Sequence, residues 1–507
     1  MSDAPQIGPK FAKSSDLAKR FGEIAEKSQK IVQEFLARQN GDGGPMGSTD
    51  AVGIGQAFLR MTADLMSEPQ KLLEAQTQLW RDYLQLWHRT SRRFLGETTT
   101  PLAIPAKGDY RFRDVAWEEN VLFDYIKQSY LLTSRWLQER VQEADGLDEH
   151  TQRKVEFYTR QFVDAMAPSN FVATNPLVLR ETVESGGENL LRGLTNLLED
   201  LEEGGGQLRI RQTDMKAFAI GQNIAVTPGK VVYQTDLMQL IQYAPTTEKV
   251  YRRPLLIIPP WINKYYILDL RPTNSFVKWA TDQGHTVFMI SWVNPDESLA
   301  HKSFEHYMKE GPLAALDAMH KCTGSRQANV IGYCLGGTLL AITLAYMAAK
   351  GDNRFTSASY FASFVDFTDT GEMSVFIDEQ QLAQLDERMQ GRGYFEGRDM
   401  ASTFNMLRAN DLIWSFVINN YLLGKDPFPF DLLYWNADST RMPAAMHSFY
   451  LRNMYHENRL TKPGGITIAG VPLDVRKITQ PSFIIGTRED HIVPWKTVYR
   501  GTQLYDA

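Results

Sequence analysis

The sequence has little cysteine, little excess charge and no long apolar run, and each shortage excludes a class of protein. Its 507 residues include only two cysteines, Cys322 and Cys334, too few for a secreted disulfide framework or a zinc site. The formal net charge of -6 provides no basic field that would attract nucleic acid phosphates. We therefore expect neither a metal centre nor a nucleic acid partner.

Signals for export or membrane insertion are also lacking. The first residues, MSDAPQIGPKFAK, do not have the apolar run and cleavage site of a secretory signal. The densest apolar stretch, residues 255–262, is interrupted by Pro259 and Pro260 and is far shorter than the roughly 20 residues that span a bilayer. These features predict a cytoplasmic protein.

The first two hundred residues are dominated by helical periodicity. Apolar residues recur at helical spacing between residues 16 and 39 and again between 72 and 87, on either side of the glycine-rich residues 41–48. Helix-like patterns continue until three glycines interrupt them at 204–206, so we predict a helical domain over residues 1–203. The two amphipathic stretches either pack against other helices or cover an apolar surface, and the pattern leaves both alternatives open.

Beyond the three glycines, short β-branched and aromatic runs alternate with helical segments. This texture predicts an α/β domain over residues 207–507, with a mostly parallel sheet of the α/β-hydrolase type. A long stretch rich in Met and aromatic residues, about 366–477, lacks strand rhythm and is predicted to be a cap insert. The predicted strands are 231–233, 255–258, 286–291, 329–333, 358–365 and 482–486.

The segment ANVIGYCLGGTLL, which starts at Ala328, has the form of a nucleophile elbow. Gly332 and Gly336 flank Cys334 as the glycines of Gly-x-Ser-x-Gly flank the serine of α/β hydrolases. A cysteine between glycines can also be a small core residue, but a strand before it and an apolar helix after it favour the catalytic interpretation. The Leu335 amide then provides one oxyanion-hole donor, and the helix dipole is expected to favour a thiolate.

The choice of cysteine indicates the type of substrate. Transfer of an acyl group from a thioester to a thiol exchanges one thioester for another, so the acyl group stays activated for the next attack. A serine ester would lose that activation. This argument favours acyl-CoA chemistry with transfer to a hydroxyl group.

In the α/β-hydrolase order the acid and the histidine follow the nucleophile along the chain. Asp490, at the end of the apolar run PSFIIG, is the predicted acid, with Glu489 second and a helix-capping role as the alternative. Only His491 follows Asp490, and adjacent side chains rarely support one another, so His491 is a poor general base. We expect the base to lie beyond Ala507.

Several phrases resemble the class I polyhydroxyalkanoate synthases from about Phe123 onward. The phrases are QFVDAMAPSNFVATNP, TPGKVVYQTDLMQLIQYAPTTEKV, PPWINKYYILDL, GHTVFMISWVNPD, EGPLAALDAM, GYCLGGTLLA and REDHIVPW. That resemblance implies a Cys-His-Asp triad in which Cys334 carries the growing chain and Asp490 is the acid. It also implies polymerisation of (R)-3-hydroxyacyl-CoA, with 3-hydroxybutyryl-CoA preferred and CoA released.

The resemblance implies further features. The second oxyanion donor is expected in the loop after residues 255–258, at the Ile262 amide, and Trp261, Asn263 and Lys264 are candidates to line the pocket, with core packing the alternative for Trp261. No cofactor is expected. The implied partners are the polyester granule surface, granule-associated proteins and a second copy in a homodimer. Two other interpretations remain open, a cysteine-dependent acyl hydrolase or thioesterase and a non-catalytic granule-surface protein.

Overall fold

The computed structural model describes residues 51–144 and 146–505, and these form two compact units. The first predicted amphipathic stretch, residues 16–39, lies outside the described residues. The first unit contains the described residues up to Asp214 together with Thr403–Phe428. The second unit contains Met215–Ser402 together with the described residues from Pro429 onward. The predicted insert 366–477 is thus divided, and its central part belongs to the helical unit.

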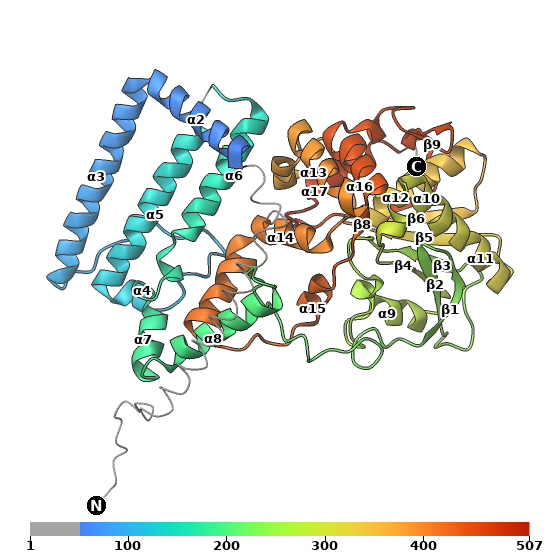
Figure 1. The fold of residues 1–507 in the computed structure, drawn as a ribbon, viewed down its shortest axis with the longest axis horizontal. Helices are drawn as coiled ribbons and strands as arrows, with labels where there is room; N and C mark the ends of the chain where they lie inside the picture. Colours follow the sequence, from blue (N-terminus) through green and yellow to red (C-terminus); the bar gives the residue numbers. More distant parts are fainter. Residues whose placement is uncertain (1–50, 145, 506–507) are drawn as a thin grey trace, which may run out of the picture. The chain divides into compact units, whose positions relative to one another are not determined.

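The first unit is helical in its described part, as predicted for the N-terminal region (Figure 1). Its helices are α2 (Ala51–Ser67), α3 (Pro69–Phe94), α4 (Ala116–Glu119), α5 (Val121–Gln142), α6 (Glu149–Ala165), the 3-10 turn η2 (Pro168–Asn170), α7 (Pro176–Glu184) and α8 (Glu188–Glu203). The later segment contributes the second half of α14 (Gly397–Leu407) and two π-helical turns, η7 (Asn410–Trp414) and η8 (Val417–Leu422).

Local sequence explains where these helices begin. The side chain of Asn120 accepts hydrogen bonds from the amides of the first turn of α5, and Asp148 does the same for α6. Asn175 caps α7, which starts with Pro176, a residue whose missing N–H costs nothing at that position. The ends of the helices are therefore specified locally, while their packing comes from apolar faces.

Helix α3 packs along α5 through one of its faces. The Tyr83 hydroxyl hydrogen-bonds to that of Thr133 at 2.7 Å, and Nε1 of Trp136 donates to the Ala75 carbonyl at 2.9 Å. Leu86 is fully buried on the same face of α3. The opposite face of α3 makes no such contacts within the described part of this unit.

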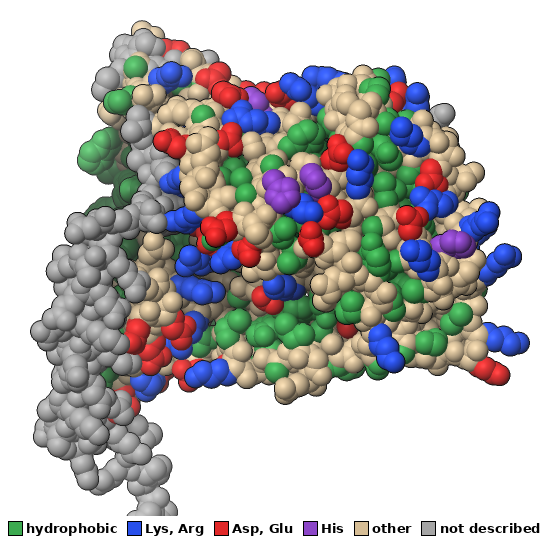
Figure 2. Space-filling view, turned by 45° about the vertical axis from the view of Figure 1, so that its right-hand side comes forward, with side chains coloured by type: hydrophobic (Ala, Val, Ile, Leu, Met, Phe, Trp, Pro, Cys, Tyr) green, Lys and Arg blue, Asp and Glu red, His purple; other side chains and the backbone are tan. Residues whose placement is uncertain are grey.

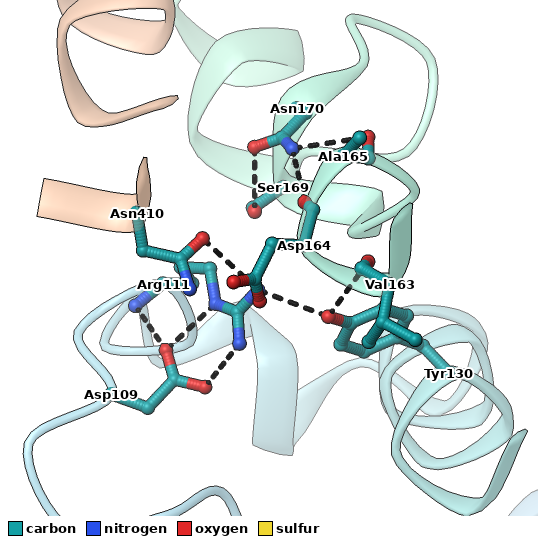
Figure 3. Close-up of polar contacts among 9 residues, drawn as sticks. All are labelled: Asp109, Arg111, Tyr130, Val163, Asp164, Ala165, Ser169, Asn170 and Asn410. Carbon is teal, nitrogen blue, oxygen red and sulfur yellow. Dashed lines mark hydrogen bonds and ion pairs between the residues drawn. The ribbon is translucent and has the colours of Figure 1, made fainter. Parts of the chain in front are cut away.

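Arg111 connects three parts of the first unit (Figure 3). Its guanidinium pairs with Asp109 at 2.8 Å and Asp164 at 3.1 Å, and donates to the Tyr130 hydroxyl at 3.0 Å. It also donates to Oδ1 of Asn410, in η7, at 3.3 Å. Burial alone would lower the pKa of Arg111, but the hydrogen bond and charge of Asp109, with the charge of Asp164, raise it overall. The arginine thus stays charged and ties the later segment to the N-terminal helices.

The later segment also packs closely against α8. A Cβ added at Gly193 would lie 1.7 Å from the Tyr421 carbonyl oxygen, so only glycine permits this approach. Asn196 donates to the Asn420 carbonyl at 3.0 Å, and the Tyr421 hydroxyl donates to the fully buried carboxylate of Asp200 at 2.6 Å. These contacts make Thr403–Phe428 part of the helical unit.

The second unit is built on a seven-stranded sheet, and the predicted α/β fold class is confirmed. The strands lie in the order β1-β2-β4-β3-β5-β6-β11, and β2 alone among these seven runs antiparallel to its neighbours, β1 and β4. Their bounds are β1 (Gly229–Gln234), β2 (Met238–Tyr243), β3 (Leu255–Ile258), β4 (Val287–Trp292), β5 (Ala328–Tyr333), β6 (Phe355–Phe361) and β11 (Ser482–Ile485).

Central strands are buried on both faces, as their continuous apolar sequences require. Leu255 and Ile257 of β3 and Met289 of β4 pack against Val277 and Ala280 of α9 (Phe276–Asp282), while the alternate residues of these strands point to the other face. All four residues of β3 are buried. The centre of the sheet therefore forms the main core of the unit.

The remaining elements of the second unit surround this sheet. Before β6 they are η3 (Tyr265–Leu268), η4 (Glu297–Leu299), α10 (Phe304–Met308), the π turn η5 (Lys309–Leu313), α11 (Ala314–Thr323) and α12 (Leu335–Ala349). After β6 they are η6 (Gly371–Phe376), α13 (Glu379–Arg392), β7 (Tyr394–Phe395), the first half of α14, α15 (Asp431–Ala437), β8 (Met442–Pro443), α16 (Ala444–Tyr450), the π turn η9 (Leu451–His456), η10 (Arg459–Thr461), β9 (Thr467–Ile468), β10 (Val471–Pro472), η11 (Val475–Lys477) and α17 (Trp495–Thr502).

Surface charge and helix length add two observations. Acidic and basic side chains are interspersed on the face drawn in Figure 2, without a large region of one sign. Within residues 51–144 and 146–505, every helix is too short or too polar to cross a bilayer.

Candidate active site

Cys334 occupies the sharp turn between β5 and α12. Its backbone has φ of 51° and ψ of -121°, a conformation that costs energy in any residue with a Cβ. The turn is held on both sides, because the Cys334 amide donates to the Phe361 carbonyl of β6 at 2.9 Å and the Gly337 amide donates to the Cys334 carbonyl at 2.9 Å. The strained strand-turn-helix geometry expected of a nucleophile elbow is therefore present, while the role of Cys334 as the nucleophile stays a prediction.

Glycines on both sides of Cys334 allow the turn to pack against neighbouring strands. A Cβ at Gly336 would lie 2.0 Å from the Ile258 carbonyl oxygen at the end of β3. One at Gly332 would lie 2.5 Å from the Cα of Gly337. Both obstacles are backbone atoms and cannot move aside as a side chain can. These glycines fix the position of Cys334 relative to the loop that follows β3.

Two tyrosines from the segment between β6 and β11 lie close to Cys334. Tyr450 is the last residue of α16, and Tyr455 belongs to the π turn η9. In a π turn, residues five positions apart lie on the same face of the helix, so Tyr450 and Tyr455 share a face. Their rings are 5.5 Å apart, and Tyr450 shares hydrogen bonds with Tyr455 and Thr338. Burial is the main reason that the pKa of each tyrosine is raised, and Cys334 adds to the shift of both. These neutral hydroxyls therefore adjoin the sulfur.

Burial also decides the ionisation of Cys334. It raises the pKa of the thiol to about 12, the Leu335 amide acts in the opposite direction, and the negative charge of Asp490 raises it further. The helix N-terminus thus favours the thiolate, as expected, but loss of solvation is the larger effect and keeps the thiol protonated. A histidine is not among the groups that shift this pKa in the described part of the chain.

Asp490 lies where the sequence predicts the acid, in the turn after β11. Its Oδ1 accepts hydrogen bonds from the amides of Ile492 and Val493, both at 2.9 Å, and its Oδ2 lies 3.3 Å from the Thr487 hydroxyl. The carboxylate is close enough to raise the pKa of Cys334. It also raises the pKa of Tyr333, for which burial and Cys334 are the larger causes. The structure thus brings Cys334 and Asp490 into one region, while the role of Asp490 as the acid stays a prediction.

Two histidines of this unit differ in their surroundings. His491, next to Asp490, is half-buried. His447 of α16 is almost fully buried, stacks on Phe395 with ring centres 4.8 Å apart, and has no hydrogen bond at either ring nitrogen within the described residues. Burial lowers its pKa to about 4, although the charge of Asp386 acts in the other direction. His447 is therefore a neutral core residue at physiological pH.

The loop after β3 holds the residues expected near the second oxyanion donor. The Ile262 carbonyl accepts the Thr440 amide at 2.8 Å, and the Lys264 carbonyl accepts Nε1 of Trp435 at 2.7 Å. Asn263 is buried and forms an isolated bridge with Ser439. These contacts fasten the loop through its carbonyls and side chains, and the Ile262 amide remains a predicted donor.

Trp261, at the start of this loop, is a core residue. Its ring is almost fully buried and packs edge-on against Phe304 at 5.6 Å and Tyr450 at 5.9 Å. It therefore supports the tyrosine that adjoins Cys334. The two tyrosines and Thr338 were not predicted from the sequence, because nothing in the surrounding residues distinguishes them from other aromatic and polar core positions.

Two protein-family models match this chain. A family model described as "Poly-beta-hydroxybutyrate polymerase (PhaC) N-terminus" matches residues 108–280, and one described as "alpha/beta hydrolase fold" matches residues 272–505. The poly(3-hydroxyalkanoate) polymerase of Methylorubrum extorquens is 54% identical over 456 residues, which cover 90% of this chain and 75% of that protein.

Two further relatives carry the name poly(3-hydroxyalkanoate) polymerase subunit PhaC. The protein from Rhizobium meliloti (strain 1021) is 48% identical over 99% of this chain and 82% of its own length. The protein from Cupriavidus necator (strain H16) is 42% identical over 91% of this chain and 77% of its own length. Identity of this level over nine tenths of the sequence shows that the chain belongs to the poly(3-hydroxyalkanoate) polymerase family.

Proposed function

We propose that this chain polymerises (R)-3-hydroxyacyl-CoA, with 3-hydroxybutyryl-CoA as its preferred substrate, and that Cys334 carries the growing polyester as a thioester. The observation that carries this proposal is the strained turn at Cys334, which presents a thiol at the start of α12. Membership in the polymerase family supports the substrate class. The preference for a four-carbon unit rests on the sequence phrases around residues 259–270 and 332–337.

The chemistry proceeds by two acyl transfers. The Cys334 sulfur attacks the thioester carbonyl of the substrate, a new thioester forms, and the CoA thiolate leaves and takes up a proton. The 3-hydroxyl oxygen of another hydroxyacyl-CoA then attacks the carbonyl of the acyl group on Cys334. An ester bond forms, the bond to sulfur breaks, and the hydroxyl proton returns to the sulfur, which regenerates the Cys334 thiol. Each cycle releases one CoA per unit added, and the acyl group stays activated throughout.

Protein groups have separate roles in these transfers. The Leu335 amide, which already lowers the pKa of Cys334, and the Ile262 amide stabilise the oxyanion. Because burial raises the pKa of the thiol, a base must take its proton as the sulfur attacks. Asp490 orients that base and assists the 3-hydroxyl group.

The buried aromatic surroundings favour polymerisation over hydrolysis. Tyr450 and Trp261 are buried and Tyr455 is half-buried, so the sulfur has apolar ring surface beside it. A site that excludes water protects an acyl thioester from hydrolysis until a hydroxyl of the next unit arrives. This favours the polymerase over a thioesterase that shares the same elbow.

We also propose that the protein is cytoplasmic and works at the surface of polyester granules, with granule-associated proteins and as a homodimer. Apolar side chains exposed on α3 support surface association.

The test compares Cys334→Ala with Cys334→Ser after incubation with 3-hydroxybutyryl-CoA. The full-length protein, which contains the predicted base, should release CoA, form insoluble polyester and show an acyl adduct on the Cys334 peptide by mass spectrometry. Cys334→Ala should lose both adduct and polymer, whereas Cys334→Ser, which keeps an attacking oxygen, should accumulate an oxygen ester with little polymer. Free 3-hydroxybutyrate as the sole product would show a thioesterase. Polymer formation by Cys334→Ala would refute the proposal.

A further inference from the structure

Asn458, which lies shortly after the π turn η9, has a left-handed backbone. Its φ of 46° and ψ of 44° are unfavourable for most residues with a Cβ, although asparagine tolerates them better than others do. The Asn458 amide donates to the Met454 carbonyl at 3.0 Å, which ends the turn. Glycine would meet this backbone requirement at least as well. The choice of asparagine therefore points to its side chain.

The oxygen and the nitrogen of the Asn458 side chain both bind one short segment, residues 366–368. Its Oδ1 accepts the Phe367 amide at 2.9 Å. Its Nδ2 donates to Oδ1 of Asp366 at 2.9 Å and to the Thr368 hydroxyl oxygen at 3.0 Å. Because only the side-chain oxygen can accept from an amide N–H, these bonds also fix which way the side-chain amide points. The side chain thus joins the end of η9 to the segment that follows β6.

The turn at residues 366–368 is formed without help from Asn458. Oδ1 of Asp366 accepts the amide of Thr368 at 2.8 Å and its hydroxyl at 2.6 Å. Nδ2 of Asn458 therefore binds two oxygens that already belong to the hydrogen bonds of this turn. The side chain of Asn458 connects two formed elements rather than building either of them.

Phe367, whose amide Asn458 holds, packs against the two tyrosines beside Cys334. Phe367 is buried, and its ring centre lies 5.1 Å from that of Tyr455 and 6.1 Å from that of Tyr450. Tyr455 is thus connected to this segment twice, through its own ring and through Asn458, three residues after it. A loss of the side chain at position 458 would therefore reach the rings that bury the sulfur.

The other end of the same segment is attached to α12, the helix that starts next to Cys334. The Phe364 carbonyl accepts the Thr338 hydroxyl at 2.7 Å. A Cβ at Gly337 would lie 2.0 Å from Oγ of Ser363, so the chain runs close to the first turn of this helix. The segment after β6 is therefore fixed to α12 at one end, and Asn458 links η9 to it at the other.

We propose that Asn458 is a positioning residue of the polymerisation reaction, which keeps Tyr455 against the Cys334 sulfur by tying the end of η9 to residues 366–368. This rests on the role of Cys334 under the proposed function. Without the link, Tyr455 and Phe367 separate from one another and water reaches the sulfur. An acyl thioester on Cys334 would then lose the apolar surroundings that protect it from hydrolysis.

Asn458→Gly in the full-length protein tests this link, because glycine keeps the left-handed backbone and removes the three side-chain hydrogen bonds. Iodoacetamide at pH 8 should alkylate the Cys334 peptide about tenfold faster than in the unmodified protein, as followed by mass spectrometry, since a solvated thiol has a lower pKa. With 3-hydroxybutyryl-CoA, kcat for CoA release should fall about tenfold or more while KM changes little. The share of free 3-hydroxybutyrate among the products should rise.

The matched control is Ala469→Gly. Ala469 also has a left-handed backbone, with φ of 52°, and its methyl side chain has no hydrogen-bonding atom. This variant changes the backbone in the same way, so alkylation, kcat and the product ratio should stay as in the unmodified protein. Equal effects in both glycine variants would assign the change to a more flexible chain and overturn the proposal.

A second pair of variants keeps the test sharp if Asn458→Gly does not fold. Asn458→Asp keeps an acceptor for the Phe367 amide but places a second carboxylate next to Asp366, so alkylation of Cys334 should again be faster. Adding Asp366→Asn removes one of the two charges and restores a donor to the pair, so the double variant should recover most of the slow alkylation and of kcat. Absence of any recovery would overturn the proposal.

Two further results would contradict the positioning role. Unchanged alkylation and product ratio in Asn458→Gly, with circular dichroism that shows a folded protein, would leave Asn458 as a residue that only ends the π turn. Faster alkylation with an unchanged kcat would show that the link buries the sulfur without serving the reaction. A failure of the proposed function is recognised separately, because the unmodified protein would then form no acyl adduct on Cys334, whereas the alkylation comparison needs no turnover.

Discussion

Alkylation of Cys334, the predicted nucleophile, tests directly what burial does to its thiol. Burial raises the pKa of the thiol to about 12 from an ordinary value of 9.0. A change of about three pH units corresponds to roughly 4 kcal/mol between the two ionisation states. At pH 8 the native thiolate should therefore be about a thousandfold scarcer than that of an unperturbed thiol. The raised pKa predicts a slow reaction, whereas activation by a helix dipole would predict a fast one.

The assay uses the Cys322→Ser chain, so that Cys334 is the only thiol. Its reaction with iodoacetamide is followed by mass spectrometry between pH 7 and pH 10.5, with the guanidinium-unfolded chain as the reference. Limited access also slows a half-buried thiol, so the shape of the profile decides the question. The native rate should rise tenfold for each pH unit and not level off, whereas the unfolded rate should level off above about pH 9. A native profile that levels off below pH 9 would refute the reasoning.

Three other changes have outcomes that the structure specifies. Asp490→Asn removes a charge that raises the pKa of Cys334, so this variant should alkylate faster at pH 8 than its parent while it releases CoA more slowly from 3-hydroxybutyryl-CoA; slower alkylation would contradict the electrostatic link. Gly336→Ala places a Cβ 2.0 Å from a backbone oxygen and should cost 2–3 kcal/mol or more in denaturant unfolding, on the scale of about 1–3 kcal/mol for overpacking. Its control is Gly391→Ala, where nothing lies within 4 Å and a change within about 1 kcal/mol is expected. For His447, burial depresses the pKa in the folded protein to about 4, below the ordinary 6.5. The unfolded chain therefore binds a proton at a higher pH than the folded protein, so the free energy of unfolding is unaffected above pH 6.5 and decreases as the pH falls toward 4. His447→Leu should therefore lose about 2.5 kcal/mol less than its parent between pH 7 and pH 4.5, and an equal loss in both would show that the ring is not buried as a neutral group.

All six predicted runs contain strands. Continuous apolar residues, typical of a buried parallel strand, explain the prediction of central strands such as β3 and β4, whereas β1 and β11 are largely exposed and were predicted from their β-branched and aromatic residues. The strand of the seven-stranded sheet that was not predicted, β2, reads MQLIQY, in which polar residues alternate with apolar ones. It pairs antiparallel between β1 and β4, where the hydrogen bonds of the sheet decide what a short mixed run becomes.

The elbow could also be predicted, since the glycines around Cys334 are a local requirement of the turn. The ionisation of the thiol could not, because it depends on burial by residues more than a hundred positions later. Tyr450 and Tyr455 reach the sulfur only because a π turn places them on one face, and the spacing of aromatic residues does not reveal a π turn. The affiliation of Thr403–Phe428 with the helical unit was likewise invisible, because contacts such as Gly193 with Tyr421 join positions more than two hundred residues apart.

The path of the chain makes it difficult to separate the two units by cutting the sequence at one position. The polypeptide crosses between the units at three peptide bonds, after Asp214, Ser402 and Phe428. A fragment that starts at Met215 would therefore keep Thr403–Phe428 but lose α8 and Arg111, and would expose the surfaces that these cover. If such a fragment lost activity, misfolding of Thr403–Phe428 could explain the loss as well as a catalytic role of the N-terminal helices. Because ribosomal synthesis delivers Thr403–Phe428 long after α8, the helical unit can complete its packing only when most of the sheet has already been made.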